Sequence, residues 1–436
     1  MSRNRKRREP FEVCVDNLSH EGRGVGRVNG KTVFVAGALP GERVLARKLR
    51  GRKSFDEALA LEIENPNPHR VEPRCPHYAI CGGCSLQHLD CEQQIQHKQS
   101  VLLELFEHHA EIAPLEVLAP ITASPWGYRR RARLGVKYVE KKGGVLVGFR
   151  EKAAPYIADI ERCEVLDDRI GDNLLTLRAL IAQLSNKTKI PQLEVALGDE
   201  VTAIIVRHLQ AFTDQDLAIL ADFQTKSQIS LYLQPEGESS VHPLNSATRS
   251  LSYQIADVEF RFSPSNFVQV NHKINCQMIE AVSGHLDLES KDKVLDLFCG
   301  LGNFTLPIAK SVDHIHGIEG DEALVKLAEQ NALHNGVANA TFAKMDLSDE
   351  ALLDKIELSN FNKLLLDPPR SGAEQLLLSG NLSSIDLLAY VSCNPVTLAR
   401  DANHLLKKHQ FKLTKLGVMD MFPHTAHVES LAIFAR

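Results

Sequence analysis

The sequence predicts a multidomain protein with an N-terminal OB-like β-barrel, a central α+β domain and a C-terminal Rossmann-like α/β domain. Its 436 residues exceed what one small module needs. Short strands separated by turn residues fill the first 65 or so residues, whereas strands alternate with helices from about Val294 onward. The composition, 44% hydrophobic and 24% charged, is typical of a soluble globular protein and excludes disorder, collagen and coiled coil.

The predicted barrel spans residues 10–69 and consists of short alternating strands. Asn29-Gly30 between alternating residues is a strong hairpin signal. The strands that we expect are Phe11–Val15, Arg27–Val28, Lys31–Val35, Glu42–Arg47 and Ala58–Ile63. A basic five-stranded barrel is a common RNA-binding shape. Asn65-Pro-Asn-Pro-His69 then breaks both helix and strand, so we place a linker there.

Charge is distributed unevenly along the chain. Residues 1–53 hold 14 Lys and Arg against 5 Asp and Glu, a net charge of +9, which leaves −14 for the rest. Such a module suits a phosphate-bearing partner, although charge alone fits a solvated surface equally well. Residues 1–9 are predicted to be a flexible basic tail without the apolar stretch of a secretory signal. With no apolar run long enough for a membrane span, we expect a cytoplasmic protein.

The central domain, residues 70–264, contains three closely spaced thiols, Cys75, Cys81 and Cys84, with Gly82-Gly83 between the last two. Such spacing favours a metal site over free core cysteines, and a tetrathiolate site needs a fourth ligand. Spacing leaves open whether Cys91 or Cys163 supplies it, and whether the centre is zinc or an iron–sulfur cluster. His77 and His88 are further possible zinc ligands. The domain's expected regular elements are a helix from Gln93 to His109 and strands at Arg133–Tyr138, Val145–Phe149, Glu194–Val206 and Ile229–Gln234.

A glycine-rich turn at Gly300 and Gly302 follows a buried strand in the C-terminal domain, residues 265–436. Glu319 ends the next strand, nineteen residues after Gly300, which matches the spacing of a ribose-binding carboxylate. Thr305 stands where a dinucleotide fingerprint requires a third glycine. S-adenosylmethionine, which has no pyrophosphate, therefore fits better than a nicotinamide cofactor.

Three further residues at strand ends carry reactive groups. Asp367-Pro-Pro-Arg370 places a carboxylate at a strand end, where open α/β sheets bind ligands. Alternatives are a rigid turn or the Asp-Pro-Pro-aromatic motif of a purine amino-methyltransferase, which Arg370 argues against. Cys393 follows an apolar strand and is a candidate nucleophile, and Glu429 precedes the last strand and is a candidate general base. Taken singly, these two would be a small core residue and a surface glutamate.

The chain resembles the RNA uracil-5-methyltransferase family along nearly its whole length. The segments that carry the resemblance, in order, are Cys75-x5-Cys81-Gly-Gly-Cys84, Tyr128-Arg-Arg-Arg131, Phe267-Val-Gln269-Val-Asn271, Asp296-Leu-Phe-Cys-Gly-Leu-Gly-Asn-Phe304, Asp367-Pro-Pro-Arg370, Ser392-Cys-Asn-Pro395 and His427-Val-Glu429. The barrel resembles a TRAM domain. Barrel and cysteines together point to the bacterial branch that methylates a uridine of 23S ribosomal RNA.

The resemblance implies a site for each function. A [4Fe-4S] cluster would be held by Cys75, Cys81, Cys84 and Cys163, so Cys163 is preferred to Cys91. Contacts to S-adenosylmethionine would come from Gln269, Phe298, Asn303, Glu319, Asp346 and Asp367. Cys393 would attack uracil C6 and Glu429 would remove the C5 proton. A helix of about residues 93–120 is expected to pack on the methyltransferase domain.

The expected partner is 23S ribosomal RNA, with no DNA, no membrane and a monomeric state. Tyr128, Arg129, Arg130 and Arg131 are candidates to hold RNA by stacking and phosphate contact. Two other functions compete with this interpretation. One is a purine amino-methyltransferase that uses Asp367-Pro-Pro, and the other is a non-catalytic RNA-binding assembly factor.

Overall fold

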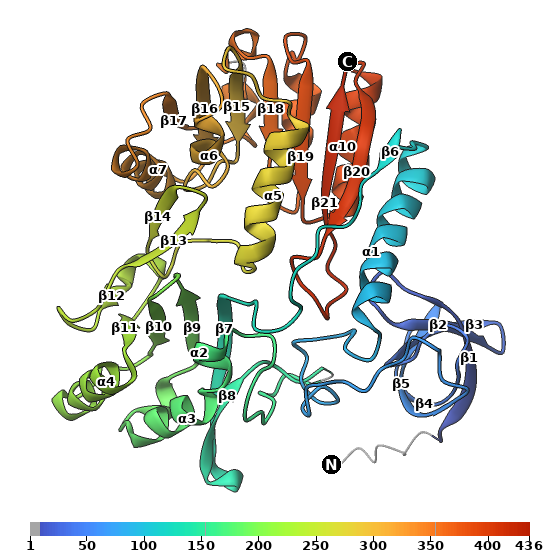
Figure 1. Cartoon of the computed structure of the whole chain (residues 1–436). Helices are drawn as coiled ribbons and strands as arrows, with labels where there is room; N and C mark the ends of the chain where they lie inside the picture. Colours follow the sequence, from blue (N-terminus) through green and yellow to red (C-terminus); the bar gives the residue numbers. More distant parts are fainter. Residues whose placement is uncertain (1–8, 153, 354) are drawn as a thin grey trace. The chain divides into compact units, whose positions relative to one another are not determined.

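The computed structural model describes residues 9–152, 154–353 and 355–436 (Figure 1). The chain divides into two compact units. The first runs up to Val101 and includes Phe422–His427, and the second contains Leu102–Met421 and Val428–Arg436. The predicted boundary at residue 264 falls within the second unit. The predicted tail, residues 1–9, lies outside the described residues except for Glu9. No helix in the described ranges is long and apolar enough to cross a membrane.

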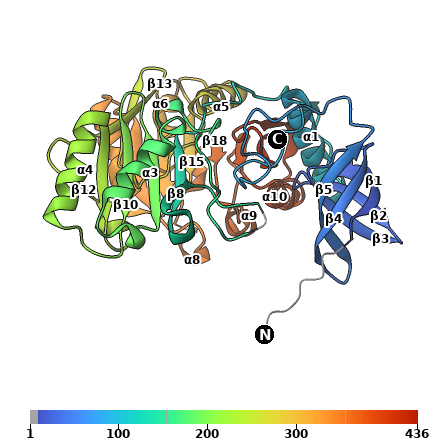
Figure 2. The same ribbon diagram turned by 90° about the horizontal axis from the view of Figure 1, so that it is seen from below.

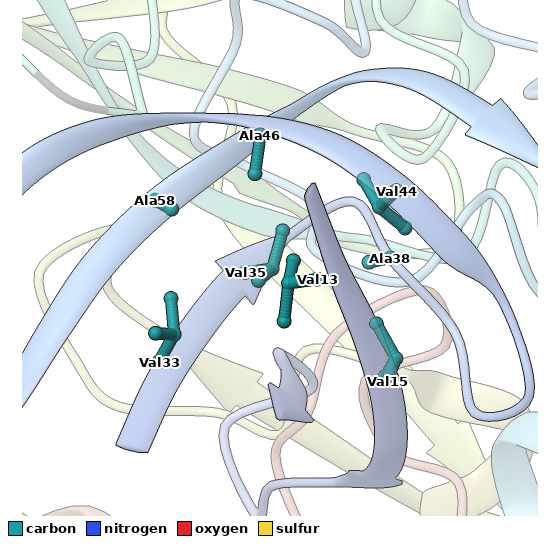
Figure 3. Close-up of a cluster of buried hydrophobic side chains, with 8 residues drawn as sticks. All are labelled: Val13, Val15, Val33, Val35, Ala38, Val44, Ala46 and Ala58. Atoms are coloured by element: carbon teal, nitrogen blue, oxygen red, sulfur yellow. The ribbon is translucent and has the colours of Figure 1, made fainter. Parts of the chain in front are cut away.

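A closed five-stranded barrel begins the first unit, as the sequence predicts. Its strands are β1 (Phe11–Leu18), β2 (Gly24–Val28), β3 (Lys31–Ala36), β4 (Arg43–Gly51) and β5 (Phe55–Glu64), in the order β1-β2-β3-β5-β4. Pairing of β4 with β1 closes it. Asn29 and Gly30 have positive φ angles of 51° and 79°, which the two-residue hairpin between β2 and β3 requires. Figure 3 shows the small core side chains: Val13, Val15, Val33, Val35, Ala38, Val44, Ala46 and Ala58.

The segment after the barrel packs on it, although Asn65–His69 is predicted to be a linker. Asn67 donates from Nδ2 to the Pro40 carbonyl at 2.8 Å. Arg70 binds the buried Glu42 carboxylate through Nε at 2.5 Å and Nη2 at 2.8 Å. Burial disfavours the Glu42 charge, but these bonds outweigh it and lower the pKa of Glu42. The cysteine-bearing segment is therefore fixed to the barrel at its start.

The second unit contains a six-stranded sheet in the order β12-β11-β10-β9-β7-β8. Its strands are β7 (Arg131–Val139), β8 (Gly144–Gly148), β9 (Gln192–Leu197), β10 (Thr202–Arg207), β11 (Ile229–Gln234) and β12 (His242–Pro243). Its helices are α2 (Asp168–Gly171), α3 (Leu174–Gln183) and α4 (Asp214–Ser227). The single strand predicted over Glu194–Val206 is wrong, because the chain turns at Gly198 and forms two antiparallel strands. A hairpin of β13 (Leu251–Ile255) and β14 (Val258–Phe262) follows.

An eight-stranded sheet in the order β17-β16-β15-β18-β19-β21-β20-β6 forms the rest of the second unit. Its strands are β6 (Glu116–Val117), β15 (Lys293–Leu297), β16 (His314–Glu319), β17 (Ala340–Lys344), β18 (Lys363–Leu366), β19 (Leu387–Ser392), β20 (Lys412–Met419) and β21 (Glu429–Ala435). β15 to β19 are parallel, as strand–helix alternation predicts, whereas β21 is antiparallel to both of its neighbours. Figure 2 shows α5 (His272–His285) on one face, and α9 (Glu374–Ser379) and α10 (Pro395–Lys407) on the other.

The remaining helices are α1 (Cys91–Leu105), α6 (Thr305–Ala309), α7 (Glu322–His334) and α8 (Glu350–Leu353). A π-helical turn, Phe106–Ala110, ends α1, so the predicted helix does not continue to residue 120. Residues after it are extended, and β6 pairs in parallel with β20. Backbone bonds from Leu118 to Leu416 at 2.9 Å and from Ile121 to Val418 at 3.0 Å continue this alignment. The segment thus reaches the large sheet as an edge strand.

Candidate active site

Four candidate side chains lie where neighbouring strands of the large sheet end. Asp296 is the penultimate residue of β15, Glu319 ends β16, Asp367 follows β18 and Cys393 follows β19. Because β15, β16, β18 and β19 are parallel and adjacent, their carboxyl ends meet at one edge of the sheet. This edge is where open α/β sheets bind ligands.

The loop after β15 is shaped by backbone conformations that glycine favours. Gly300 and Gly302 have φ angles of 57° and 88°, and Phe298 adopts 66°, which is rare for a residue with a side chain. Glu319 fixes this loop by accepting the Gly300 N–H at 3.0 Å through Oε2. Its other oxygen, Oε1, accepts the Asp321 N–H at 3.0 Å. The two residues whose nineteen-residue spacing was noted in the sequence, Gly300 and Glu319, are therefore in direct contact.

Gln269 and Asn303 lie in two different segments that meet helix α5. Gln269 is half-buried and lies two residues before Asn271, whose side chain accepts the Ile274 N–H at the start of α5. Asn303 lies in the glycine loop, and its amide bonds reciprocally with Asn275 of α5 at 2.9 and 3.0 Å. Helix α5 therefore connects the two segments.

Asp346 differs from the other candidates because it is exposed. It follows β17, and its Oδ1 accepts both the N–H and the hydroxyl of Ser348, at 2.9 and 2.6 Å. The Ser348 hydroxyl and N–H lower the pKa of Asp346, so the carboxylate is charged at neutral pH. The Met345 N–H bonds the Glu319 carbonyl at 2.9 Å, which keeps this segment beside β16.

Two carboxyl groups at the sheet edge have strongly raised pKa values. Burial raises the pKa of Asp367 to about 7. Burial also raises the pKa of Asp296 to about 7. The hydrogen bond from Thr305 lowers this pKa, whereas the negative charges of Asp367 and Glu319 raise it further. Thr305 Oγ1 donates to Asp296 Oδ2 at 2.5 Å, while the buried Asp296 Oδ1 has no hydrogen-bond partner among the described residues. A cationic ligand is the natural complement of such a site.

Cys393 and Glu429 are brought together by strand register. Ser392 of β19 pairs with Ser430 of antiparallel β21, so the next pair along is Cys393 with Glu429. Burial raises the pKa of the Cys393 thiol to about 11, and the negative charges of Glu429 and Asp367 act in the same direction. Arg370 opposes them. The thiol, carboxylate and guanidinium are thus close enough to influence one another.

The cysteine segment lies in the first unit without regular secondary structure. Cys81 is buried, Cys75 and Cys84 are half-buried, and the Gly83 N–H points at Cys81 Sγ at 3.4 Å. Cys91, at the start of α1, is exposed. Cys163 belongs to the second unit, and its N–H bonds the Gly171 carbonyl.

Metal coordination is not visible in the side-chain positions. Among the described residues, no three His, Cys, Asp or Glu side chains converge on one metal position. His88, a possible zinc ligand by sequence, has Nδ1 2.6 Å from the Tyr78 hydroxyl.

The aromatic-basic run before β7 is more buried than its sequence suggests. Tyr128 is only 8% exposed, which leaves little of its ring for base stacking. Arg130 pairs with Asp199 at 2.6 Å, and Arg131 donates to the Ser265 carbonyl at 2.9 Å. Phe267 was not among the predicted site residues, yet its ring is 65% exposed two residues before Gln269. The sequence signal that could have singled out Phe267 is an aromatic residue that lies outside any strand or helix.

Comparison with known proteins identifies the family. The family model described as tRNA (Uracil-5-)-methyltransferase matches residues 90–436, and the TRAM domain model matches residues 4–47. A 23S rRNA (uracil(1939)-C(5))-methyltransferase RlmD from Alkalilimnicola ehrlichii is 49% identical over 441 residues, with 100% of this chain and 99% of the relative covered. The enzyme of the same description from Hahella chejuensis is 45% identical, with both chains fully covered.

A solved structure shows the same fold at low sequence identity. It is the tRNA (uracil-54, C5)-methyltransferase of Pyrococcus abyssi in complex with S-adenosyl-L-homocysteine, with a TM-score of 0.75 and 22% identity. The match covers 98% of this chain and 100% of that one. With matches of this extent to both sequence and fold, the chain belongs to the RNA uracil-5-methyltransferase family and, within it, to the RlmD type.

Proposed function

We propose that the protein transfers a methyl group from S-adenosylmethionine to C5 of uridine 1939 in 23S ribosomal RNA. The observation that carries this proposal is the pairing of Ser392 with Ser430, which places the next residues, Cys393 and Glu429, near each other at the acidic edge of the parallel sheet. Relatives that are 45% to 49% identical over their full length bear this activity in their names. A ribosomal RNA substrate implies that the enzyme works in the cytoplasm.

The proposed reaction begins at uracil C6, because C5 is a poor nucleophile. The target base leaves its stack to reach the half-buried thiol. The Cys393 thiolate bonds to C6, and the C5–C6 double-bond electrons make C5 an enolate carbon. C5 then takes the methyl group from the sulfonium, whose sulfur keeps the electrons of the broken bond and leaves as the neutral thioether. Covalent catalysis thus divides one difficult step into easier ones.

Glu429 completes the reaction by acting as a base. After transfer, C5 carries both the methyl group and a hydrogen. Glu429 takes this hydrogen as a proton, the electrons restore the C5–C6 double bond, and the bond between Cys393 Sγ and C6 breaks. Glu429 is therefore needed for release, whereas Cys393 is needed for the first bond.

The raised pKa of Cys393 suggests that the thiol becomes reactive only after the methyl donor binds. With a pKa of about 11, the free protein keeps Cys393 protonated at neutral pH. Part of that elevation comes from the charge of Asp367. A cationic methyl donor bound at Asp367 offsets this charge, so the thiolate is favoured once the donor is present. Arg370 acts in the same direction.

Methyl transfer from labelled S-adenosylmethionine to unmodified 23S ribosomal RNA and transfer RNA tests the proposal. We expect 5-methyluridine in the ribosomal RNA, identified by mass spectrometry. Cys393→Ala is expected to form no adduct and no product. Glu429→Gln is expected to slow turnover by about 10²- to 10⁴-fold and to accumulate a covalent protein–RNA adduct.

Two outcomes would favour the competing functions. A methylated purine made by Cys393→Ala would indicate amino-group methylation through Asp367-Pro-Pro. RNA binding without methyl-donor binding would indicate an assembly factor.

We propose further that Cys75, Cys81, Cys84 and Cys163 hold a [4Fe-4S] cluster with a structural role. The spacing of the first three thiols supports this, as does the Gly83 N–H directed at Cys81 Sγ, because amide bonds to sulfur stabilise such clusters. Iron and sulfide contents after anaerobic purification of Cys163→Ser and Cys91→Ser separate the two possible fourth ligands. Loss of iron from Cys91→Ser alone would contradict Cys163, and stoichiometric zinc in the unmodified protein would contradict the cluster.

A further inference from the structure

The amide of Asn303 is held by two side chains from elsewhere in the second unit. Asn275, on α5 and 2% exposed, donates to Asn303 Oδ1 at 3.0 Å and accepts from Asn303 Nδ2 at 2.9 Å. Tyr253, on β13 and 6% exposed, donates its hydroxyl to the same Oδ1 at 3.1 Å. Three hydrogen bonds thus converge on one side chain of the glycine loop.

These bonds use every hydrogen-bonding group of the Asn303 carboxamide except one. A carboxamide oxygen has two lone pairs and its nitrogen has two hydrogens. Asn275 and Tyr253 occupy both lone pairs of Oδ1, and Asn275 Oδ1 takes one of the Nδ2 hydrogens. Within the described part of the chain, one side-chain N–H of Asn303 is therefore left for another partner.

The two supporting side chains are themselves fixed. The Tyr253 ring stacks on Phe260, with centroids 5.0 Å apart and planes at 14°, and meets Phe262 edge-on at 5.6 Å. Burial raises the pKa of Tyr253, so its hydroxyl stays a donor at all physiological pH values. Asn275 lies in the first turns of α5, which the Asn271 side chain caps. Neither side chain can follow Asn303 if that residue rotates.

We propose that Tyr253 and Asn275 are positioning residues of the methyl-donor site. They fix the rotamer of Asn303 and the direction of its amide, so that Asn303 offers a hydrogen-bond donor and not an acceptor. Asn303 therefore recognises an acceptor group of S-adenosylmethionine, such as a carboxylate, ribose or ring-nitrogen lone pair. This inference rests on the proposed function, since it takes Asn303 as a contact of the methyl donor.

The Tyr253→Phe variant tests the proposal with the smallest change, because it removes the hydroxyl and keeps the stacked ring. We expect the Kd for S-adenosylmethionine, measured by calorimetry, and its KM to rise about five- to tenfold, the loss typical of one hydrogen bond. The KM for RNA and kcat should stay within about twofold. A Kd equal to that of the unmodified protein would overturn the proposal.

A matched control is Tyr232→Phe, which removes the hydroxyl that Tyr232 donates to the Arg249 carbonyl in the six-stranded sheet. It should leave methyl-donor binding unchanged. A double variant shows whether Tyr253 acts through Asn303. In an Asn303→Ala background, adding Tyr253→Phe should weaken binding no further. A further loss there would mean that Tyr253 supports the fold or the ligand by another route, which contradicts a positioning role.

The same measurements separate this proposal from the proposed function. If the unmodified protein bound no methyl donor and methylated no RNA, the function itself would be wrong. If the unmodified protein bound and transferred normally and Tyr253→Phe matched it, only the positioning proposal would be wrong.

Discussion

Cys393 is the residue whose chemistry depends most on its neighbours. It lies between two carboxylates that disfavour its thiolate and one guanidinium that favours it. A thiol with a pKa of about 11 reacts slowly with electrophiles at neutral pH, because the thiolate is the nucleophile. We therefore expect the free enzyme to react slowly with alkylating and oxidising agents at Cys393.

Glu429→Gln is predicted to make the Cys393 thiol more reactive in the absence of RNA. Removing the negative charge lowers the pKa of Cys393, so the thiolate fraction at a fixed pH of about 9 rises. We expect alkylation by iodoacetamide to accelerate several-fold, measured by mass spectrometry of the Cys393 peptide. Glu280→Gln, on exposed α5 surface, is the control. An unchanged or slower rate would show that Glu429 does not act on this thiol.

Sequence patterns at this scale located strand-end side chains but not the residues that support them. Glu319 was placed by its distance from Gly300, and the two residues are in direct contact. Tyr253 lies 50 residues from Asn303, in a segment whose sequence shows only alternation. A local pattern reports residue type and spacing, but not which distant side chain completes a hydrogen bond. For the same reason it did not reveal that Tyr128 is buried.

At the scale of elements, the parallel strands collect negative charge at one edge of the sheet. β15, β16 and β18 contribute Asp296, Glu319 and Asp367 respectively. Two of these carboxyls have pKa values of about 7, so the edge gains charge as pH rises through neutrality. A sulfonium is stabilised by that charge, whereas a thioether is not.

Methyl-donor affinity is therefore predicted to rise with pH. Below about pH 7, Asp296 and Asp367 are largely protonated and neutral, and above it they are charged and attract the sulfonium. We expect S-adenosylmethionine to bind several-fold more tightly at about pH 8 than at about pH 6 by calorimetry. S-adenosylhomocysteine should change much less, and Asp367→Asn should flatten the difference. Equal pH dependence of both ligands would argue against charge recognition.

Element boundaries were predictable where turn residues mark them. The hairpin at Asn29-Gly30 and the strands of the barrel were found because their signals are local. The single strand predicted over residues 194–206 overlooked a polar turn at Gly198-Asp199-Glu200. A Cβ added at Gly198 would lie 2.4 Å from the Ser252 carbonyl oxygen. That close approach of β13 depends on tertiary structure. The antiparallel direction of β21 likewise depends on pairing that no spacing reveals.

At the scale of the whole molecule, the chain separates basic charge from catalytic residues. The net charge of +9 lies within residues 1–53, whereas residues 54–436 carry −14 and include all the proposed methyl-transfer side chains. An overall charge of −5 therefore conceals a segment suited to phosphates. The separation of basic charge from the catalytic residues can be read from the sequence alone. The inclusion of Phe422–His427 in the first unit could not be predicted from length or charge.

Replacing Arg47, Arg50 and Arg52 of the barrel by Gln is predicted to weaken RNA binding without affecting the methyl donor. All three are exposed, so each can bind a phosphate and release counterions. The slope of log affinity against log salt concentration should decrease by about 0.7 to 0.9 for each phosphate that the variant no longer neutralises. Filter binding of 23S ribosomal RNA fragments at several salt concentrations measures this slope.

The control for this experiment removes equal charge from the second unit by replacing the exposed Lys226, Lys291 and Lys326 with Gln. If both triple variants lowered the salt slope equally, RNA binding would depend on overall charge and not on the barrel.

The inclusion of Phe422–His427 in the first unit has a consequence for how the protein is made. Lys98 is buried and donates to the Phe422 carbonyl, and Gln94 bonds the backbone and ring of His424, across 324 and 330 residues. During synthesis the barrel and cysteine segment leave the ribosome long before Phe422–His427, so these bonds form only after that later segment has followed. A nascent chain stalled before Phe422 would therefore hold an unfinished N-terminal unit.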